Sequence, residues 1–99
     1  LVDMLQVIAS PSFIRVIKKL HPKEKKLVDV AIQALAKDPL LGEQKRGDLS
    51  KVFVYKFKIN RQEILMAYEL LPNKAKPKQV LMLYLGAHEN FYRTLKLQD

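Results

Sequence analysis

The feature that most constrains the fold of this chain is a change in the spacing of its apolar residues near residue 40. Before that point apolar residues recur at helical spacing, and after it they alternate with polar residues, as along a half-buried strand. Helices followed by strands predict an α+β domain in which the helices cover one face of a sheet. The 99 residues are enough for one small core, so we expect a single domain over residues 1–99.

Two helices are expected in the first part of the chain. Ser10 supplies a hydroxyl N-cap, and Pro11 stands at the first helical position, where its missing N–H costs nothing. His21 and Pro22 end this helix and open a second one, which stops at Asp38 because a residue before proline avoids the helical conformation. The second helix is expected to bury Leu27, Ala31, Ala34 and Leu35.

The second part of the chain predicts strands. Along residues 51–59 one face carries Phe53, Tyr55, Phe57 and Ile59, whereas the other begins with valines and ends with Lys56 and Lys58. The expected strands lie at residues 5–9, 51–59, 64–71 and 80–85, and a closing helix lies at residues 89–97. Gly86 is expected to end the last strand. The order β-α-α-β-β-β-α predicts an antiparallel sheet with the N-terminal helical hairpin packed on one face.

The composition excludes several kinds of site. The chain has no cysteine, which excludes disulfides, thiolate nucleophiles and cysteine-based metal sites and fits a reducing compartment. No apolar run approaches the roughly 18 residues that span a bilayer, and residues 1–9 lack the basic leader and cleavage pattern of a signal peptide. Two distant histidines and scattered carboxylates form no recognisable metal site. We expect a soluble cytoplasmic protein that uses no metal and no cofactor.

The charge of the chain indicates a polyanionic partner. Its formal net charge is +8, and self-repulsion of this size destabilises a compact fold, so it usually serves binding. The excess is uneven, because residues 1–44 carry seven Lys/Arg against five Asp/Glu, whereas residues 45–99 carry eleven against five. Nucleic acid, an acidic protein and an anionic membrane all fit, and the membrane fits least because the apolar positions are used in a core.

Three segments together resemble the RelE/ParE superfamily of toxins. They are the opening Ser10-Pro11-Ser12-Phe13 with its lysine-rich first helix, the segment Lys45-Arg46-Gly47-Asp48-Leu49 followed by two strands, and the ending Leu85-Gly86-Ala87-His88-Glu89-Asn90-Phe91-Tyr92-Arg93. The ending is similar to the family's C-terminal signature, which is a strand, a glycine, then a histidine or arginine and an aromatic residue. The resemblance covers almost the whole chain in the family's order.

This resemblance implies a toxin of a type II toxin–antitoxin system. In the RelE branch it implies a metal-independent endoribonuclease that cuts mRNA at the A site of the 30S ribosomal subunit and inhibits translation. In the ParE branch it implies an inhibitor of DNA gyrase instead. Both branches imply an acidic antitoxin that covers the basic face, and neither implies a membrane or a small-molecule cofactor.

The residues themselves suggest how RNA would be cleaved. Cleavage without a metal needs a group that titrates near neutrality and fixed cations that stabilise the phosphate. His88 and Tyr92 are four positions apart, so a closing helix that includes both would put them on one face. Lys56 and Lys58 share one face of a strand. These four residues are the catalytic candidates; the structural alternatives are a loop histidine, a packed tyrosine and a solvated strand face.

Further basic residues are candidates for binding RNA. They are Lys45, Arg46, Arg61 and Arg93. Many members of the family carry an arginine at the start of the strand after the meander turn, but residues 62–65 here are Gln-Glu-Ile-Leu and Arg61 falls in the turn. We therefore weight His88 above any arginine. Asp48 is a secondary candidate for orienting a base, and His21, before a proline between two helices, is expected to be structural.

Three functions stay open from the sequence: an mRNA endonuclease, a gyrase inhibitor without nuclease activity, and a non-catalytic basic RNA-binding module. The concentration of basic residues and the His88 and Tyr92 ending favour the nuclease, because a protein-binding poison needs neither. The nuclease hypothesis depends on one spatial expectation. The outward lysines of the alternating strand and the imidazole of His88 should face a common concavity.

Overall fold

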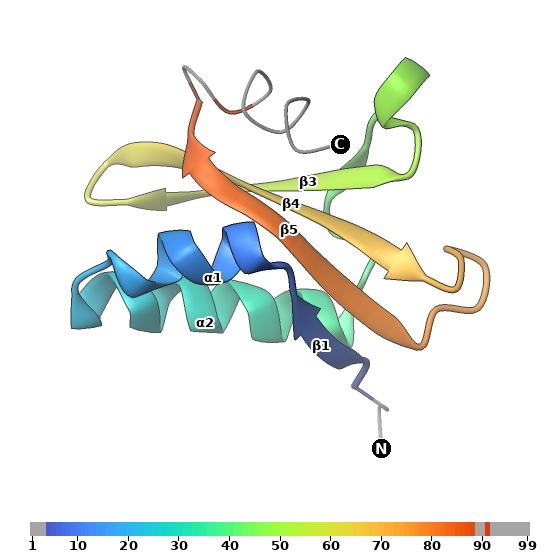
Figure 1. Ribbon diagram of the computed structural model, residues 1–99, viewed down its shortest axis with the longest axis horizontal. Helices are drawn as coiled ribbons and strands as arrows, with labels where there is room; N and C mark the ends of the chain where they lie inside the picture. The colour runs from blue at the N-terminus through green and yellow to red at the C-terminus, as the bar shows by residue number, and fades with distance from the viewer. Residues whose placement is uncertain (1–3, 89–90, 92–99) are drawn as a thin grey trace.

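The computed structural model describes residues 4–88 and residue 91. Two helices lie on one side of a five-stranded sheet (Figure 1). In chain order the elements are β1 (Gln6–Ala9), α1 (Pro11–Lys18), α2 (Pro22–Lys37), β2 (Glu43–Gln44), the short 3-10 helix η1 (Gly47–Leu49), β3 (Val52–Ile59), β4 (Gln62–Leu71) and β5 (Gln79–Ala87). The helical hairpin followed by strands confirms the predicted α+β fold.

The strands follow the order β1-β5-β4-β3-β2 across the sheet. β3, β4 and β5 form the antiparallel meander that the sequence predicts. β1 instead pairs in parallel with β5, so the sheet is mixed rather than wholly antiparallel, and the first strand lies beside the last (Figure 1). β2 was not predicted, because two residues are too few to produce an alternating pattern.

The main core lies between the helices and the sheet. Its buried members are Phe13, Val28, Ala31, Leu35, Phe53, Ile59, Met66, Tyr68, Leu70, Val80, Met82 and Leu85. Phe53 and Tyr68 stack with ring centroids 5.4 Å apart. The Tyr68 hydroxyl donates to the Pro39 carbonyl at 2.7 Å and accepts from the Gly42 N–H at 2.9 Å. The hydroxyl of this buried tyrosine is therefore satisfied, and it fixes the connection between α2 and β2.

A smaller cluster lies on the other face of the sheet. Its buried members are Leu49, Val52, Val54, Leu65, Ala67 and Phe91. The valines come from the start of β3, so the cluster occupies the part of this face nearest η1. The rest of the face, toward the β3–β4 turn, is left for polar side chains.

Ser10 connects α1 to the sheet and confirms the predicted N-cap. Its hydroxyl oxygen accepts from the Phe13 N–H at 3.1 Å and donates to the Leu83 carbonyl at 2.8 Å. Leu83 is the extra residue of a β-bulge, because Ala67 pairs with Tyr84 while Tyr68 pairs with Met82. A bulge disrupts the ladder and leaves a backbone group unpaired. The serine hydroxyl supplies the missing partner.

Two expectations at the level of single residues are wrong. Leu27 is 46% exposed and Val28 only 1%, so Val28 takes the buried position expected for Leu27, although Ala31 and Leu35 are buried as predicted. Gly86 does not end β5, which continues to Ala87. The predicted closing helix at residues 89–97 lies outside the described residues, apart from Phe91. Within the described part of the chain, no helix is both long and apolar enough to cross a membrane.

Candidate active site

We call the face of the sheet turned away from α1 and α2 the open face. Tyr55 and Phe57 pack with the helix-side core, whereas Val54 belongs to the cluster on the opposite face. Successive side chains of a strand alternate between faces, so Lys56 and Lys58 lie on the open face. Both lysines are exposed, as the alternation of β3 predicts.

The strand register extends this site from Lys58 toward His88. Lys58 lies opposite Glu63 on β4, and Ile64 lies opposite Ala87 on β5. His88 is the residue after the end of β5, which is the position level with Glu63 in that register. Adjacent strands are about 4.8 Å apart, so β3 and β5 are separated by about 10 Å. Lys58, Glu63 and the exposed His88 therefore mark one row across the turn end of the sheet.

Tyr84 is a candidate that the sequence analysis missed. It is level with Ala67 on the open face, and its ring is tilted against Phe91 with centroids 5.7 Å apart. A Cβ at Gly86 would lie 2.9 Å from Tyr84 Cε2 and 3.4 Å from the hydroxyl oxygen. The ring therefore lies over Gly86, and glycine leaves the room for it. The signal was present in the sequence, because a tyrosine two residues before a glycine shares its strand face.

A carboxylate lies on the other side of Lys56. β2 pairs Glu43 with Val54 and so puts it on the open face. Glu43 Oε1 accepts from Lys45 Nζ at 3.0 Å. The hydrogen bond and charge of Lys45 lower the pKa of the Glu43 carboxyl against the effect of desolvation, and the charges of Lys56 and Arg46 lower it further. Three cations thus lie within electrostatic reach of one carboxylate.

The predicted RNA-binding residues flank the row rather than join it. The Lys45 N–H donates to the Val52 carbonyl at 2.8 Å, so Lys45 is level with the start of β3. That position is about 20 Å along the strand from Lys58. Arg46 follows it and is exposed. Arg61 is at the tip of the β3–β4 turn, where its φ is 68°, and therefore lies at the Lys58 end.

Other predicted residues have separate outcomes. Tyr92 and Arg93 lie outside the described residues, so the pairing of Tyr92 with His88 stays a prediction. Asp48 lies in η1, which precedes β3. His21 is the N-cap of α2, on the side of the sheet away from the open face, and this agrees with the structural role expected for it.

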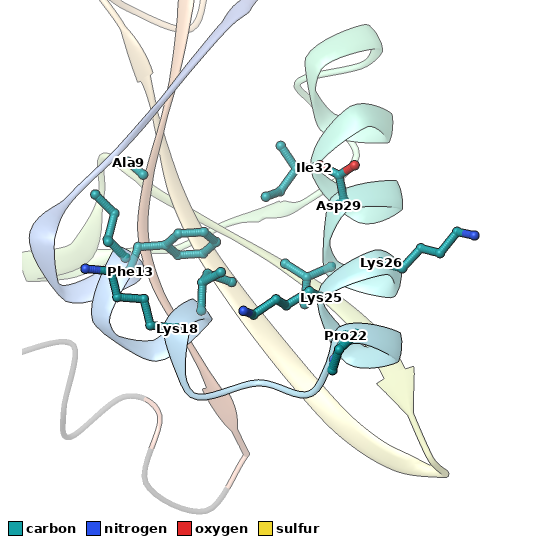
Figure 2. Close-up of a pocket in the computed structure, with 11 residues that line it drawn as sticks. Ala9, Phe13, Lys18, Pro22, Lys25, Lys26, Asp29 and Ile32 are labelled. Atoms are coloured by element: carbon teal, nitrogen blue, oxygen red, sulfur yellow. The ribbon is translucent and has the colours of Figure 1, made fainter.

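A second candidate site lies between α1 and α2. It is a groove of about 530 Å³, and its residues include Phe13, Ile14, Ile17 and Ile32 on the apolar side and Lys18, Lys25, Lys26 and Asp29 among the charged ones. Figure 2 shows the Phe13 ring pointing into the space between the helices and the Lys25 side chain extending toward α1. Ile14 is 43% exposed although it belongs to an apolar helix face. The groove is thus an apolar surface bordered mainly by lysines.

Residues 7–96 match the family described as ParE-like toxin of type II bacterial toxin-antitoxin system. The chain belongs to this toxin family. The match confirms the resemblance to RelE/ParE toxins found in the sequence. No curated protein sequence matches the chain.

The fold of the toxin is similar to several solved structures. A chain of the toxin–antitoxin complex RelBE2 from Mycobacterium tuberculosis has a TM-score of 0.69 at 20% identity, over 86% of this chain and 99% of that one. A mutant of the Escherichia coli toxin RelE in the free state has a TM-score of 0.72 at 10% identity, over 96% and 97%. A mutant of the same toxin in complex with an antitoxin RelBc peptide has a TM-score of 0.64 at 12% identity, over 92% and 94%. At these identities the likeness concerns the fold alone.

Proposed function

We propose that this toxin is a metal-independent endoribonuclease of the cytoplasm, which cleaves mRNA at the A site of the 30S ribosomal subunit and so stops translation. The observation that carries the proposal is the turn end of the open face. There Lys56 and Lys58 are exposed on β3, and His88 follows the end of β5. Fixed cations near a group that titrates close to neutrality are what metal-free RNA cleavage requires.

Each residue has a separate chemical task in this proposal. Lys56 and Lys58 stabilise the extra negative charge that develops on the phosphate. His88 transfers a proton during attack of the 2′-hydroxyl or departure of the 5′ oxygen, with Tyr92 as its predicted neighbour. The RNA on either side of the cleaved bond is held by Lys45, Arg46, Arg61 and Arg93.

The imidazole is tested by His88→Ala. The rate of mRNA cleavage on translating ribosomes should fall by about 10²- to 10⁴-fold, the usual contribution of a positioned proton-transfer group. His21→Asn is the matched control, because it removes the other histidine while retaining a good N-cap for α2. Cleavage at the full rate by a folded His88→Ala protein would contradict the assignment.

The two lysines are tested by Lys56→Gln and Lys58→Gln. Loss of one fixed cation should reduce the cleavage rate by about 10²-fold, in line with the removal of one donor from a transition-state site. Lys37→Gln at the end of α2 removes the same charge on the helix side and should leave the rate unchanged. Equal rates in all three variants would remove the lysines from the site.

The family description favours one alternative, inhibition of DNA gyrase by a ParE-like toxin. A supercoiling assay with purified gyrase separates the two activities. The proposal expects supercoiling to be unaffected and message to be cut. Inhibition of supercoiling at low toxin concentration, with RNA left intact, would reverse the ranking.

We also propose that the partner is an acidic antitoxin, one segment of which occupies the groove between α1 and α2. An amphipathic helix would place apolar side chains against Phe13 and Ile14 and acidic ones beside the bordering lysines. Solved relatives support a partner of this kind, because RelBE2 was solved as a toxin–antitoxin complex and an E. coli RelE mutant was solved with an antitoxin peptide.

A further inference from the structure

The carboxylate of Glu43 occupies a position on the open face where an anionic ligand would be expected to bind. Its carboxylate lies 3.0 Å from Lys45 Nζ, and the charges of Lys56 and Arg46 also act on it. The side chain of Glu43 is 73% exposed, whereas that of Lys45 is 19% exposed. A well-hydrated carboxylate therefore lies beside the partly covered Lys45 and the exposed Arg46 and Lys56.

The strand register explains this arrangement. Glu43 is opposite Val54, and Lys56 is two residues further along the same face of β3. Diagonal neighbours of this kind are within reach of long side chains. Lys45 is two residues from Glu43 on the opposite side, so Glu43 lies between the two lysines on one face of the sheet. A phosphate group that bridged Lys45 and Lys56 would occupy the same space.

We propose that Glu43 is a built-in competitor of the RNA phosphate, which occupies the anion position of the Lys45, Arg46 and Lys56 cluster until RNA displaces it. The inference rests on the proposed function, since it names the regulation of the same RNA-binding face. Its consequence is a lower affinity for every polyanion that uses this cluster. A ligand held by this cluster alone is then bound weakly, whereas an RNA held by further contacts still displaces the carboxylate.

The alternative role for Glu43 is to hold Lys45 in the orientation that binds RNA. The two roles predict opposite signs. If the carboxylate competes, Glu43→Gln strengthens the binding of polyanions, because one negative charge leaves the cluster. If it orients Lys45, the same substitution weakens binding. Exposed ion pairs contribute little to stability, so the variant is expected to fold normally.

The experiment compares the wild type, Glu43→Gln and Glu24→Gln with two ligands. The first is an oligoribonucleotide with 2′-O-methyl groups, which cannot be cleaved, and the second is tripolyphosphate. Dissociation constants are measured by calorimetry at several salt concentrations. Glu24 is the matched control, because it lies in the first turn of α2 at the opposite side of the sheet and does not line the groove. Glutamine keeps an oxygen that can accept from the His21 N–H, and the substitution changes the net charge equally.

Glu43→Gln should bind both ligands about threefold more tightly, the size expected for one unit charge at close range in a well-solvated site. Its salt dependence with the oligonucleotide should also steepen by about 0.7 in log–log slope, since one more cation of the cluster neutralises a phosphate. Glu24→Gln should match the wild type, because charges beyond about 8 Å are largely screened at physiological salt.

Two outcomes would overturn the inference: weaker binding by Glu43→Gln, or binding equal to that of Glu24→Gln. The proposed nuclease function is tested separately by cleavage on ribosomes. Even if the toxin cuts no RNA, its dissociation constants for tripolyphosphate would still show whether Glu43 competes with anions. A toxin that cuts RNA but shows no effect of Glu43 would leave the nuclease proposal standing without this refinement.

Discussion

Tyr68 joins three parts of the chain through one buried phenol group. Its ring stacks on Phe53, and its hydroxyl bridges the Pro39 carbonyl and the Gly42 N–H. A Cβ on Gly42 would lie 2.6 Å from this hydroxyl oxygen, so the close approach of the backbone requires glycine. The segment that leads into β2, and with it Glu43, is therefore positioned by a residue of the core.

Tyr68 gives the toxin an alkaline limit of stability. Burial raises the pKa of Tyr68 to about 12, with the charge of Asp38 adding to the shift and the hydrogen bond from Gly42 opposing it. Because the folded pKa exceeds the unfolded value of about 10, this stabilisation is complete below the unfolded pKa and is lost as the pH rises through the folded one. In urea titrations across this range, the unfolding free energy of the wild type should fall more steeply than that of Tyr68→Phe.

Below that range Tyr68→Phe should be less stable than the wild type by about 1 kcal/mol, because Gly42 and Pro39 lose a hydrogen-bond partner. The two pH curves should therefore approach each other as the pH rises. Curves that stay parallel would mean that Tyr68 has the same pKa in the folded and the unfolded protein, which would contradict the prediction.

Gly86 tests the position of Tyr84 on the open face. Gly86→Ala places a Cβ 2.9 Å from the Tyr84 ring, which must move because it is the end of a side chain and the backbone of β5 is fixed. We expect a loss of about 1 kcal/mol in unfolding free energy. In a Tyr84→Leu background the same substitution should cost less, as a double-mutant cycle by urea denaturation would measure. Equal costs in both backgrounds would contradict the contact.

At the scale of elements, the β3–β4 turn combines a strained backbone with a charged tip. Asn60 and Arg61 have φ values of 51° and 68°, which are the left-handed conformations of a two-residue type I′ turn. Asparagine is well suited to this conformation, whereas a left-handed residue with a long side chain costs about 1 kcal/mol or more. Arginine is thus an unfavourable residue for the left-handed conformation that this turn requires. Contact with RNA is the benefit that our proposal assigns to it.

Arg61→Gly should therefore separate stability from function. Asn-Gly is the favoured sequence for this turn, so the unfolding free energy should rise by about 0.5–1 kcal/mol. RNA affinity and cleavage should fall in the same variant, because a cation leaves the Lys58 end of the sheet. Arg61→Asn is the control that tolerates the conformation without glycine. A stabilised variant with unchanged cleavage would exclude Arg61 from the RNA surface.

At the scale of the whole molecule, the sheet separates two surfaces. The basic open face carries the residues assigned to RNA. α1 and α2, whose residues line the groove, lie on the other side of the sheet (Figure 1). An antitoxin segment in the groove would not touch Lys58 or His88. Neutralisation would then require a further part of the antitoxin that reaches around the sheet, and the acidic character expected of the partner suits that task.

The two surfaces should be separable by mutation. Ile14→Glu adds a negative charge inside the groove and should weaken antitoxin binding by at least about tenfold, because an unpaired charge would be buried in the complex. Cleavage by the free toxin should be unchanged. Val30→Glu is the control, since Val30 is 64% exposed on α2 and does not line the groove. Normal antitoxin binding by Ile14→Glu would place the partner elsewhere.

Local signals account for what could be predicted from the sequence. The cap at Ser10, the stop at Asp38 and the alternation of β3 each depend on neighbouring residues. Pairing between distant strands does not, so the parallel β1–β5 pair and the two-residue β2 were missed. For the same reason Glu43 was not recognised as a member of the site, whereas the local signal for Tyr84, a tyrosine two residues before a glycine, was overlooked. The position of Glu43 beside Lys56 depends on the register of β2 and β3.

The lysine-bearing half of β3 forms an outer edge of the sheet that the described residues build. From Tyr55 onward no strand among the described residues pairs with that side of β3. A bare edge of this kind invites a second molecule to add a strand, and charged side chains discourage it by repulsion. Lys56 and Lys58 thus also protect the toxin from polymerising through its own sheet. Leucine at either position would create an apolar edge that promotes aggregation. A loss of activity in such a variant would then reflect aggregation and not the loss of a catalytic lysine. Glutamine changes the charge and keeps the edge polar.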